Sequence, residues 1–115
     1  MNAPFQFHQA SRVLGLVSGR WVLAVLDEVG AASMRHSELL GAIDGVSEKV
    51  LTETLRRMER DGLIAREVSS GVANHVVYRA TLLARSLDGP LSGLLAWQVV
   101  YWSEVEASRA QWDSD

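Results

Sequence analysis

Residues 45–67 read GVSEKVLTETLRRMERDGLIARE, and this stretch decides the fold class. Ser47 is a residue type that caps helix N-termini, and Gly62 is the type that most often follows a helix C-terminus. The apolar residues between them recur at the spacing of one helix face: Leu51, Leu55 and Met58. The stretch therefore predicts an amphipathic helix that ends at Asp61-Gly62 and packs its apolar side on a core.

Shorter amphipathic segments precede this helix. Apolar spacing predicts helices over residues 10–17 and 22–29, and Ser18-Gly19 separates them. Ser37 is the expected N-cap of a third helix that runs through Ile43 and is followed by the turn 44–46. The chain thus presents two helices joined by a short turn that contains glycine.

Strand and helix signals follow the same stretch. Residues 63–68 and 75–80 have strand character, and the turn-rich segment 69–74 between them predicts a β-hairpin. Thr81 is the expected cap of a short helix over 82–87, and a long helix is expected from Pro90 to about residue 110.

This order of elements predicts a mainly α fold with a small β-hairpin, a winged helix-turn-helix with extra helices at both ends. We expect residues 1–115 to form a single domain. Its parts are an N-terminal arm (1–8), the helix-turn-helix (37–61), the wing hairpin (63–80) and a C-terminal dimerisation helix (90–110).

Composition narrows the class of protein. With 48% hydrophobic and 22% charged residues, the chain resembles an ordinary globular protein rather than a disordered one. It contains no cysteine, which excludes disulfides and thiol catalysis and suits a cytoplasmic protein. No apolar run is long enough to span a membrane, and the first residues do not resemble a signal peptide.

The helix over 47–61 sorts its charges onto one face, although the net charge of the chain is -3. The side opposite its apolar residues carries Lys49, Glu53, Arg56 and Arg60, flanked by Thr52 and Arg57. Long polar side chains on an apolar-backed helix are what a DNA recognition helix needs to reach bases and phosphates. The alternative interpretation is a solvated face held by Glu–Arg pairs such as Glu53-Arg57.

Four stretches resemble the HxlR-type winged helix-turn-helix regulators of the MarR-like superfamily. They are SGRW (18–21), RHSELL (35–40), GVSEKVLTETLRRMERDGLIARE (45–67) and VVYRATLLARSL (76–87). The resemblance covers roughly residues 8–97. It implies a cytoplasmic homodimer that binds a palindromic double-stranded DNA operator and uses its first and last helices as the dimer interface. It also implies DNA contacts by Ser47, Lys49, Thr52 and Arg56 and by the hairpin tip.

The full set of expected DNA-binding residues extends from the helix-turn-helix into the wing: Arg35, Ser47, Lys49, Thr52, Glu53, Arg56, Arg60, Ser69, Ser70, Asn74 and His75. Two positions depart from the family pattern. His8 stands where the family often has a cysteine, so thiol redox sensing is not expected. His75 is the only residue of 72–75 that can carry charge, so we expect fewer phosphate contacts from the wing than is usual.

The expected last helix is rich in aromatic residues. Its amphipathic stripe predicts a dimer seam, because a small domain cannot bury two sides of a 20-residue helix. The second interpretation is a pocket for a small planar aromatic effector, with Trp21, Trp97, Tyr101 and Trp102 as candidate residues. The two interpretations are compatible.

No motif of an enzyme or a cofactor site occurs, and the histidines His8, His36 and His75 are not spaced as metal ligands. We therefore predict a transcriptional regulator that responds to an effector, with no catalytic residue, metal or cofactor. The alternative is a protein that binds or sequesters small molecules on a winged-helix scaffold with weakened DNA binding.

Overall fold

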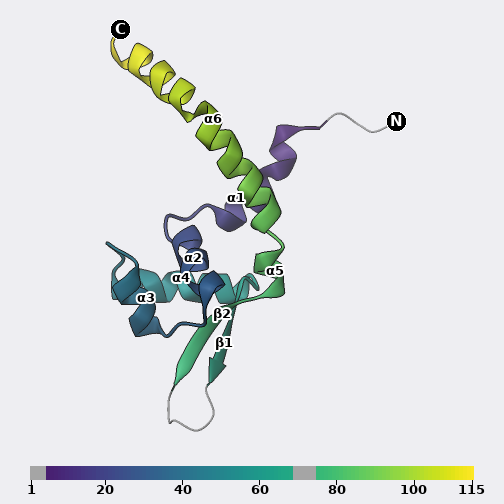
Figure 1. Ribbon diagram of the computed structural model, residues 1–115, viewed down its shortest axis with the longest axis vertical. Coiled ribbons are helices and arrows are strands. Elements are labelled where there is room, and N and C mark those ends of the chain that lie inside the picture. Colours follow the sequence, from purple (N-terminus) through teal and green to yellow (C-terminus); the bar gives the residue numbers. More distant parts are fainter. Residues whose placement is uncertain (1–4, 69–74) are drawn as a thin grey trace. The chain divides into compact units, whose positions relative to one another are not determined.

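A computed structural model describes residues 5–68 and 75–115. The chain divides into two compact units, Met1–Arg85 and Ser86–Asp115. The first unit contains η1 (Phe7–Ala10), α1 (Ser11–Val17), α2 (Val22–Ala31), α3 (His36–Ala42), α4 (Glu48–Arg60), β1 (Ile64–Val68), β2 (Val76–Ala80) and α5 (Leu82–Arg85) (Figure 1). The second unit contains α6 (Asp88–Asp113).

The first unit is a winged helix-turn-helix, as the sequence predicts. The turn 43–47 joins α3 to α4, and the antiparallel hairpin follows with Ile64 opposite Ala80 and Val68 opposite Val76. Figure 1 shows this hairpin projecting away from the helices. Met34 adds an isolated bridge to Tyr78, with backbone hydrogen bonds of 2.7 and 2.9 Å, which ties the segment before α3 to β2.

The core of this unit lies where its helices meet the base of the hairpin. The predicted apolar face of α4 is confirmed, since Leu51, Leu55 and Met58 are at most 2% exposed. They are joined in the core by buried residues from α2, α3 and β1: Val22, Val25, Val29, Leu39 and Ile64. This packing fixes which side of α4 is left for a partner.

Both ends of α4 form as predicted. The Ser47 hydroxyl accepts a hydrogen bond from the backbone N–H of Val50 at 3.1 Å. Gly62 has a φ of 78°, in the left-handed region where glycine pays no Cβ penalty. These local signals define the length and position of the helix.

The predicted start of α3 is wrong by two residues. Arg35, not Ser37, is the N-cap, and its extended backbone (φ -82°, ψ 159°) precedes the helix. The reason is that the Glu38 carboxylate accepts the Arg35 backbone N–H at 2.8 Å, which satisfies an N-terminal donor two residues before Ser37.

The ends of the chain also differ from the predicted bounds. Phe7 and His8 lie in η1, so the expected arm over 1–8 is shorter; residues 1–4 lie outside the described part. The last helix begins at Asp88 and ends at Asp113, rather than spanning 90–110. Pro90 is tolerated because it stands in the first turn, where no backbone N–H has a helical partner.

Within the described residues, no helix is both long enough and apolar enough to cross a membrane.

Candidate nucleic-acid interface

The outward side of α4 carries long polar side chains. Lys49, Glu53, Arg56 and Arg60 are all exposed, opposite the buried apolar face. Within residues 5–68 and 75–115 the ion pairs are Arg35–Glu38 and Arg79–Glu67, and neither involves α4. The structure therefore gives no support to the interpretation of this face as a set of Glu–Arg pairs, and its three cations are available to an anionic partner.

Thr52 lies on α4, and its hydroxyl forms hydrogen bonds with other residues of the chain. Its Oγ1 donates to the Glu48 carbonyl oxygen at 2.9 Å, and Nε2 of His36 lies 3.0 Å from the same Oγ1. The second contact joins the first residue of α3 to α4 across the turn. This contact was not predicted from the sequence.

Arg35 and His75 both affect the ionisation of Glu38, near the start of α3. The pKa of the Glu38 carboxyl is lowered from its ordinary value, first by the hydrogen bond from the Arg35 backbone N–H. Partial desolvation opposes this effect, whereas the Arg35 side chain, 3.4 Å from the carboxylate, and the charge of His75 add to it. The guanidinium of Arg35 is thus already paired with a carboxylate.

The wing is described only at its strands. Ser69, Ser70 and Asn74, expected to contact DNA, lie outside the described residues, and His75 at the edge of β2 is half-buried. Arg79 pairs with Glu67 across the hairpin. Arg66 on β1 is exposed, and no hydrogen bond or ion pair joins it to the described part of the chain. Arg66 is a cation that the predicted set of DNA-binding residues omitted.

Arg57 differs from the other basic residues of α4. Its Nη2 donates to the Gly15 carbonyl oxygen near the end of α1 at 2.7 Å. A Cβ added to Gly19 would lie 3.1 Å from Nη1 of Arg57. The Arg57 guanidinium therefore fills the space beside the turn between α1 and α2. Although it is exposed, this arginine is therefore engaged in joining α4 to the end of α1.

The four aromatic candidates for an effector site lie in both units. Trp21, in the first unit, is half-buried; the Arg20 guanidinium covers its ring at 4.7 Å, and its edge lies 3.5 Å from where a Gly45 Cβ would be. On α6, the rings of Trp97 and Tyr101 are 5.4 Å apart. Trp102 on the same helix lies under the guanidinium of Arg109, 5.2 Å from its ring centroid.

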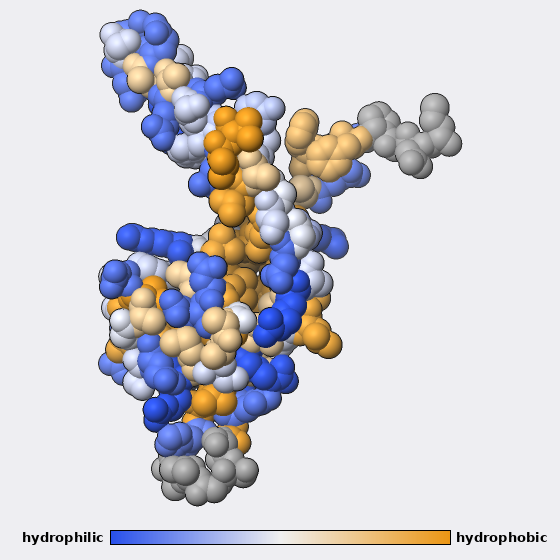
Figure 2. Space-filling view, viewed as in Figure 1, coloured by the Kyte–Doolittle hydropathy of each residue, from blue (hydrophilic) through white to orange (hydrophobic). Residues whose placement is uncertain are grey.

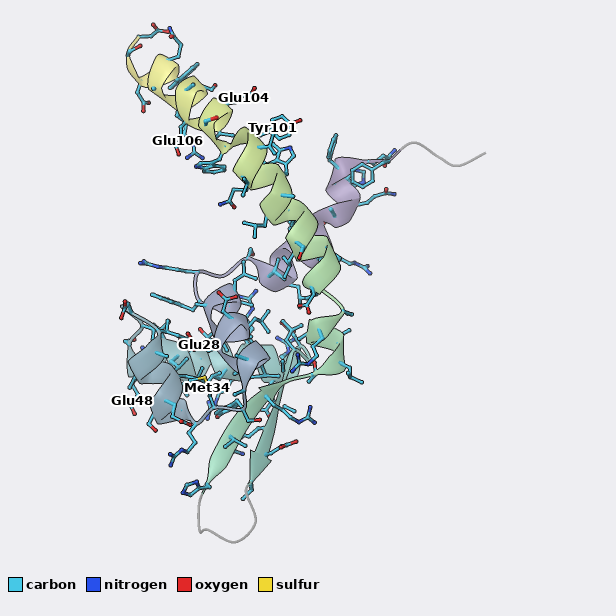
Figure 3. The ribbon with its side chains drawn as sticks, in the orientation of Figure 1. Glu28, Met34, Glu48, Tyr101, Glu104 and Glu106 are labelled. Carbon is cyan, nitrogen blue, oxygen red and sulfur yellow. The ribbon has the colours of Figure 1, made fainter. Side chains whose placement is uncertain are left out.

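Helix α6 has no buried residue. Large apolar side chains on it are 40–77% exposed over residues 94–102. Figure 2 shows hydrophobic side chains gathered along this part of α6 and hydrophilic ones at its C-terminal end. Tyr101 and Glu106 project from it in different directions (Figure 3).

No group of three His, Cys, Asp or Glu side chains that could hold a metal occurs among the residues the structure describes.

A hairpin-flanked helix-turn-helix with an unpaired basic face defines a helix-turn-helix regulator of transcription. The HxlR-like helix-turn-helix family model matches residues 16–106, and the chain belongs to this family.

Individual relatives agree with this assignment. The uncharacterized HTH-type transcriptional regulator YtcD of Bacillus subtilis is 36% identical over 84 residues, which cover 73% of this chain and 67% of YtcD. A crystal structure of a MarR-family transcriptional regulator from Enterococcus faecalis has a TM-score of 0.78 and 31% identity. The match covers 93% of this chain and 99% of that one. The redox regulator HypR in its reduced form shares the fold, with a TM-score of 0.74, 23% identity, and coverage of 86% and 98%.

Proposed function

We propose that the protein is a sequence-specific DNA-binding regulator that inserts α4 into the major groove. The observation that carries this proposal is the exposed face of α4, where Lys49, Arg56 and Arg60 have no ionic partner within the described residues. Because α4 packs its apolar side on the core, its long polar side chains point outward and can reach base edges in the major groove. Glu53 on the same face is suited to accept from cytosine N4 and to repel misplaced phosphates.

We also propose roles for the flanking residues. Ser47 presents its backbone at the N-terminus of α4, and the exposed Arg66 on β1 is placed to contact a phosphate beside the groove. Arg35, Ser69, Ser70, Asn74 and His75 stay candidate contacts of the α3 start and the wing. A cytoplasmic protein that acts by binding, rather than by catalysis, is consistent with relatives named as transcriptional regulators.

We propose further that the protein is a homodimer on a palindromic operator. Support comes from α6, which has no buried residue and whose large apolar side chains at positions 94–102 are 40–77% exposed. Large apolar side chains that lie exposed next to one another are typical of a surface that binds other protein. A twofold dimer would place two α4 helices about one DNA turn apart, roughly 34–36 Å.

The test is fluorescence anisotropy with the DNA upstream of the protein's own gene and with a scrambled duplex, over a series of salt concentrations. We expect at least ~10³-fold preference for the specific duplex and a salt slope of several units. The Arg56→Glu variant should lose this preference, because it places a carboxylate where the helix face meets DNA.

Arg85→Glu is the matched control, since it makes the same charge change on the exposed surface of α5. Its affinity for the specific duplex should be only slightly lower than that of the unmodified protein, because the added negative charge weakens binding to any DNA by a small amount. If Arg56→Glu binds its duplex as well as Arg85→Glu does, α4 does not read DNA in this way.

A second candidate function is the binding of a small planar aromatic molecule, either as an effector or with the protein acting mainly as its sequestering partner. The neighbouring rings of Trp97 and Tyr101 favour it, because these residues are 51% and 44% exposed on α6. Saturable tryptophan quenching by a panel of planar aromatics, reduced in a Trp97→Leu variant, would support it. Thiol-based sensing is not proposed, because the chain contains no cysteine.

A further inference from the structure

The hydrogen of the Thr52 hydroxyl and one of its two lone pairs are engaged within the helix-turn-helix. Its Oγ1 donates to the Glu48 carbonyl oxygen at 2.9 Å. A hydroxyl has a single hydrogen, so the contact of 3.0 Å with His36 places the hydrogen on Nε2, which donates to Oγ1. The hydroxyl of Thr52 therefore has no hydrogen left for an acceptor on DNA.

This geometry restricts what Thr52 offers to a base. Purine N7, guanine O6 and thymine O4 all require a donor, and Thr52 would have to break its bond to Glu48 to supply one. What remains of the side chain is one lone pair of Oγ1, which could accept only from adenine N6 or cytosine N4, and the γ-methyl. In the major groove, the base that carries a complementary methyl group is thymine.

His36 also restricts the conformation of Thr52. A threonine in a helix divides between two χ1 rotamers, because its hydroxyl has more than one way to reach a preceding carbonyl. A second bond from α3 favours the rotamer in which the hydroxyl faces both Glu48 and His36. The orientation of the methyl is then set by a residue that need not touch DNA.

We propose that Thr52 contacts DNA through its γ-methyl and selects a thymine in each half-site, and that His36 is the positioning residue for this contact. The inference rests on the proposed function of α4 and adds the chemistry of one specificity-determining residue.

The experiment begins with selection of a binding site from randomised duplexes by the full-length protein. Each thymine of the selected half-site is then replaced by deoxyuridine, which removes only the C5 methyl. At one thymine we expect binding to weaken about fourfold, which corresponds to the ~0.8 kcal/mol of one buried methyl-sized group at 1.4 kcal/mol per tenfold change.

Two variants of Thr52 separate its groups. Thr52→Ser keeps both hydrogen bonds and loses the methyl, so it should bind the thymine and deoxyuridine duplexes equally. Thr52→Val keeps a methyl and loses the hydroxyl, so it should still prefer thymine. His36→Phe removes the donor and should reduce the ratio of the two affinities, whereas a merely structural role of His36 would change both affinities by the same factor.

The outcomes distinguish this inference from the proposed function. If no deoxyuridine substitution affects the unmodified protein, or Thr52→Ser keeps its preference for thymine, the methyl contact is overturned while the loss of binding in Arg56→Glu still supports α4 as the recognition helix. If no sequence is selected, or Arg56→Glu binds normally, the proposed function fails and this inference fails with it.

Discussion

Glu38 shows how a single exposed residue can define the start of a helix. Its carboxylate accepts the backbone N–H of Arg35 at 2.8 Å, and this bond is the main reason its pKa is lowered. A carboxyl whose pKa is lower in the folded state stabilises the fold at pH values above its unfolded pKa, about 4.3. That contribution is lost as the pH falls through the folded value.

We therefore expect Glu38→Gln to lower the melting temperature at pH 7 and to have a smaller effect in acid. Circular dichroism melts of both proteins between pH 7 and pH 3 measure the difference. The gap between the two melting temperatures should begin to narrow below about pH 4.3, where the carboxyl of the unfolded chain becomes protonated. It should narrow further as the pH falls through the lower pKa of the native carboxyl. A gap that is constant over this range would show that the charge of Glu38 does not contribute.

At the scale of elements, α4 depends on the residue that follows it. Gly62 has a φ of 78°, and its added Cβ would lie 3.4 Å from Cδ2 of Leu83 on α5. Gly62→Ala should destabilise the protein by about 1–2 kcal/mol, the penalty of an L-residue in the left-handed region. Urea denaturation followed by circular dichroism measures the free energy of unfolding.

Gly41→Ala is the matched comparison for that measurement. Gly41 lies in α3, and an added Cβ would have no neighbour within 4 Å. The same substitution should stabilise the protein there by roughly 0.5–1 kcal/mol, because alanine loses less conformational entropy in a helix. Equal effects of the two substitutions would contradict the assignment of the α4 end to backbone conformation.

At the level of the whole molecule, the exposed apolar residues of α6 are relevant to how copies of the chain associate. The apolar residues of α6 are exposed in the single chain, and burying them against another protein surface would be favourable. We propose that this surface is a second copy of the chain. Sedimentation should therefore give twice the chain mass at micromolar concentration. Leu95→Lys, at a residue that is 57% exposed on α6, should shift the protein to the monomer.

Ser108→Lys is the control for this shift, since it adds the same charge at an exposed residue of the hydrophilic end of α6. It should remain dimeric. A monomeric unmodified protein at these concentrations would mean that the apolar part of α6 has another partner.

Local sequence patterns were enough to predict the class of fold and which side of α4 is buried. Ser47, Gly62 and the apolar spacing between them act over a few residues, so a local pattern is enough to place the helix and its buried side. Relying on local patterns also explains why the predicted start of α3 was wrong. Ser37 and Arg35 compete for one helix start, and the bond from Arg35 to Glu38 decides between them.

The roles of individual side chains on α4 depend on packing between distant segments of the chain. Arg57 and Arg56 are neighbours of the same type and both are exposed. Yet Arg57 donates to Gly15, 42 residues earlier, while no hydrogen bond or ion pair joins the Arg56 side chain to the described part of the chain. Thr52 has its hydroxyl engaged by His36, 16 residues before it. Contacts of this kind depend on packing between elements that the chain brings together from a distance. The periodicity of one helix therefore identifies its outward face, but not which residues on that face are free to bind.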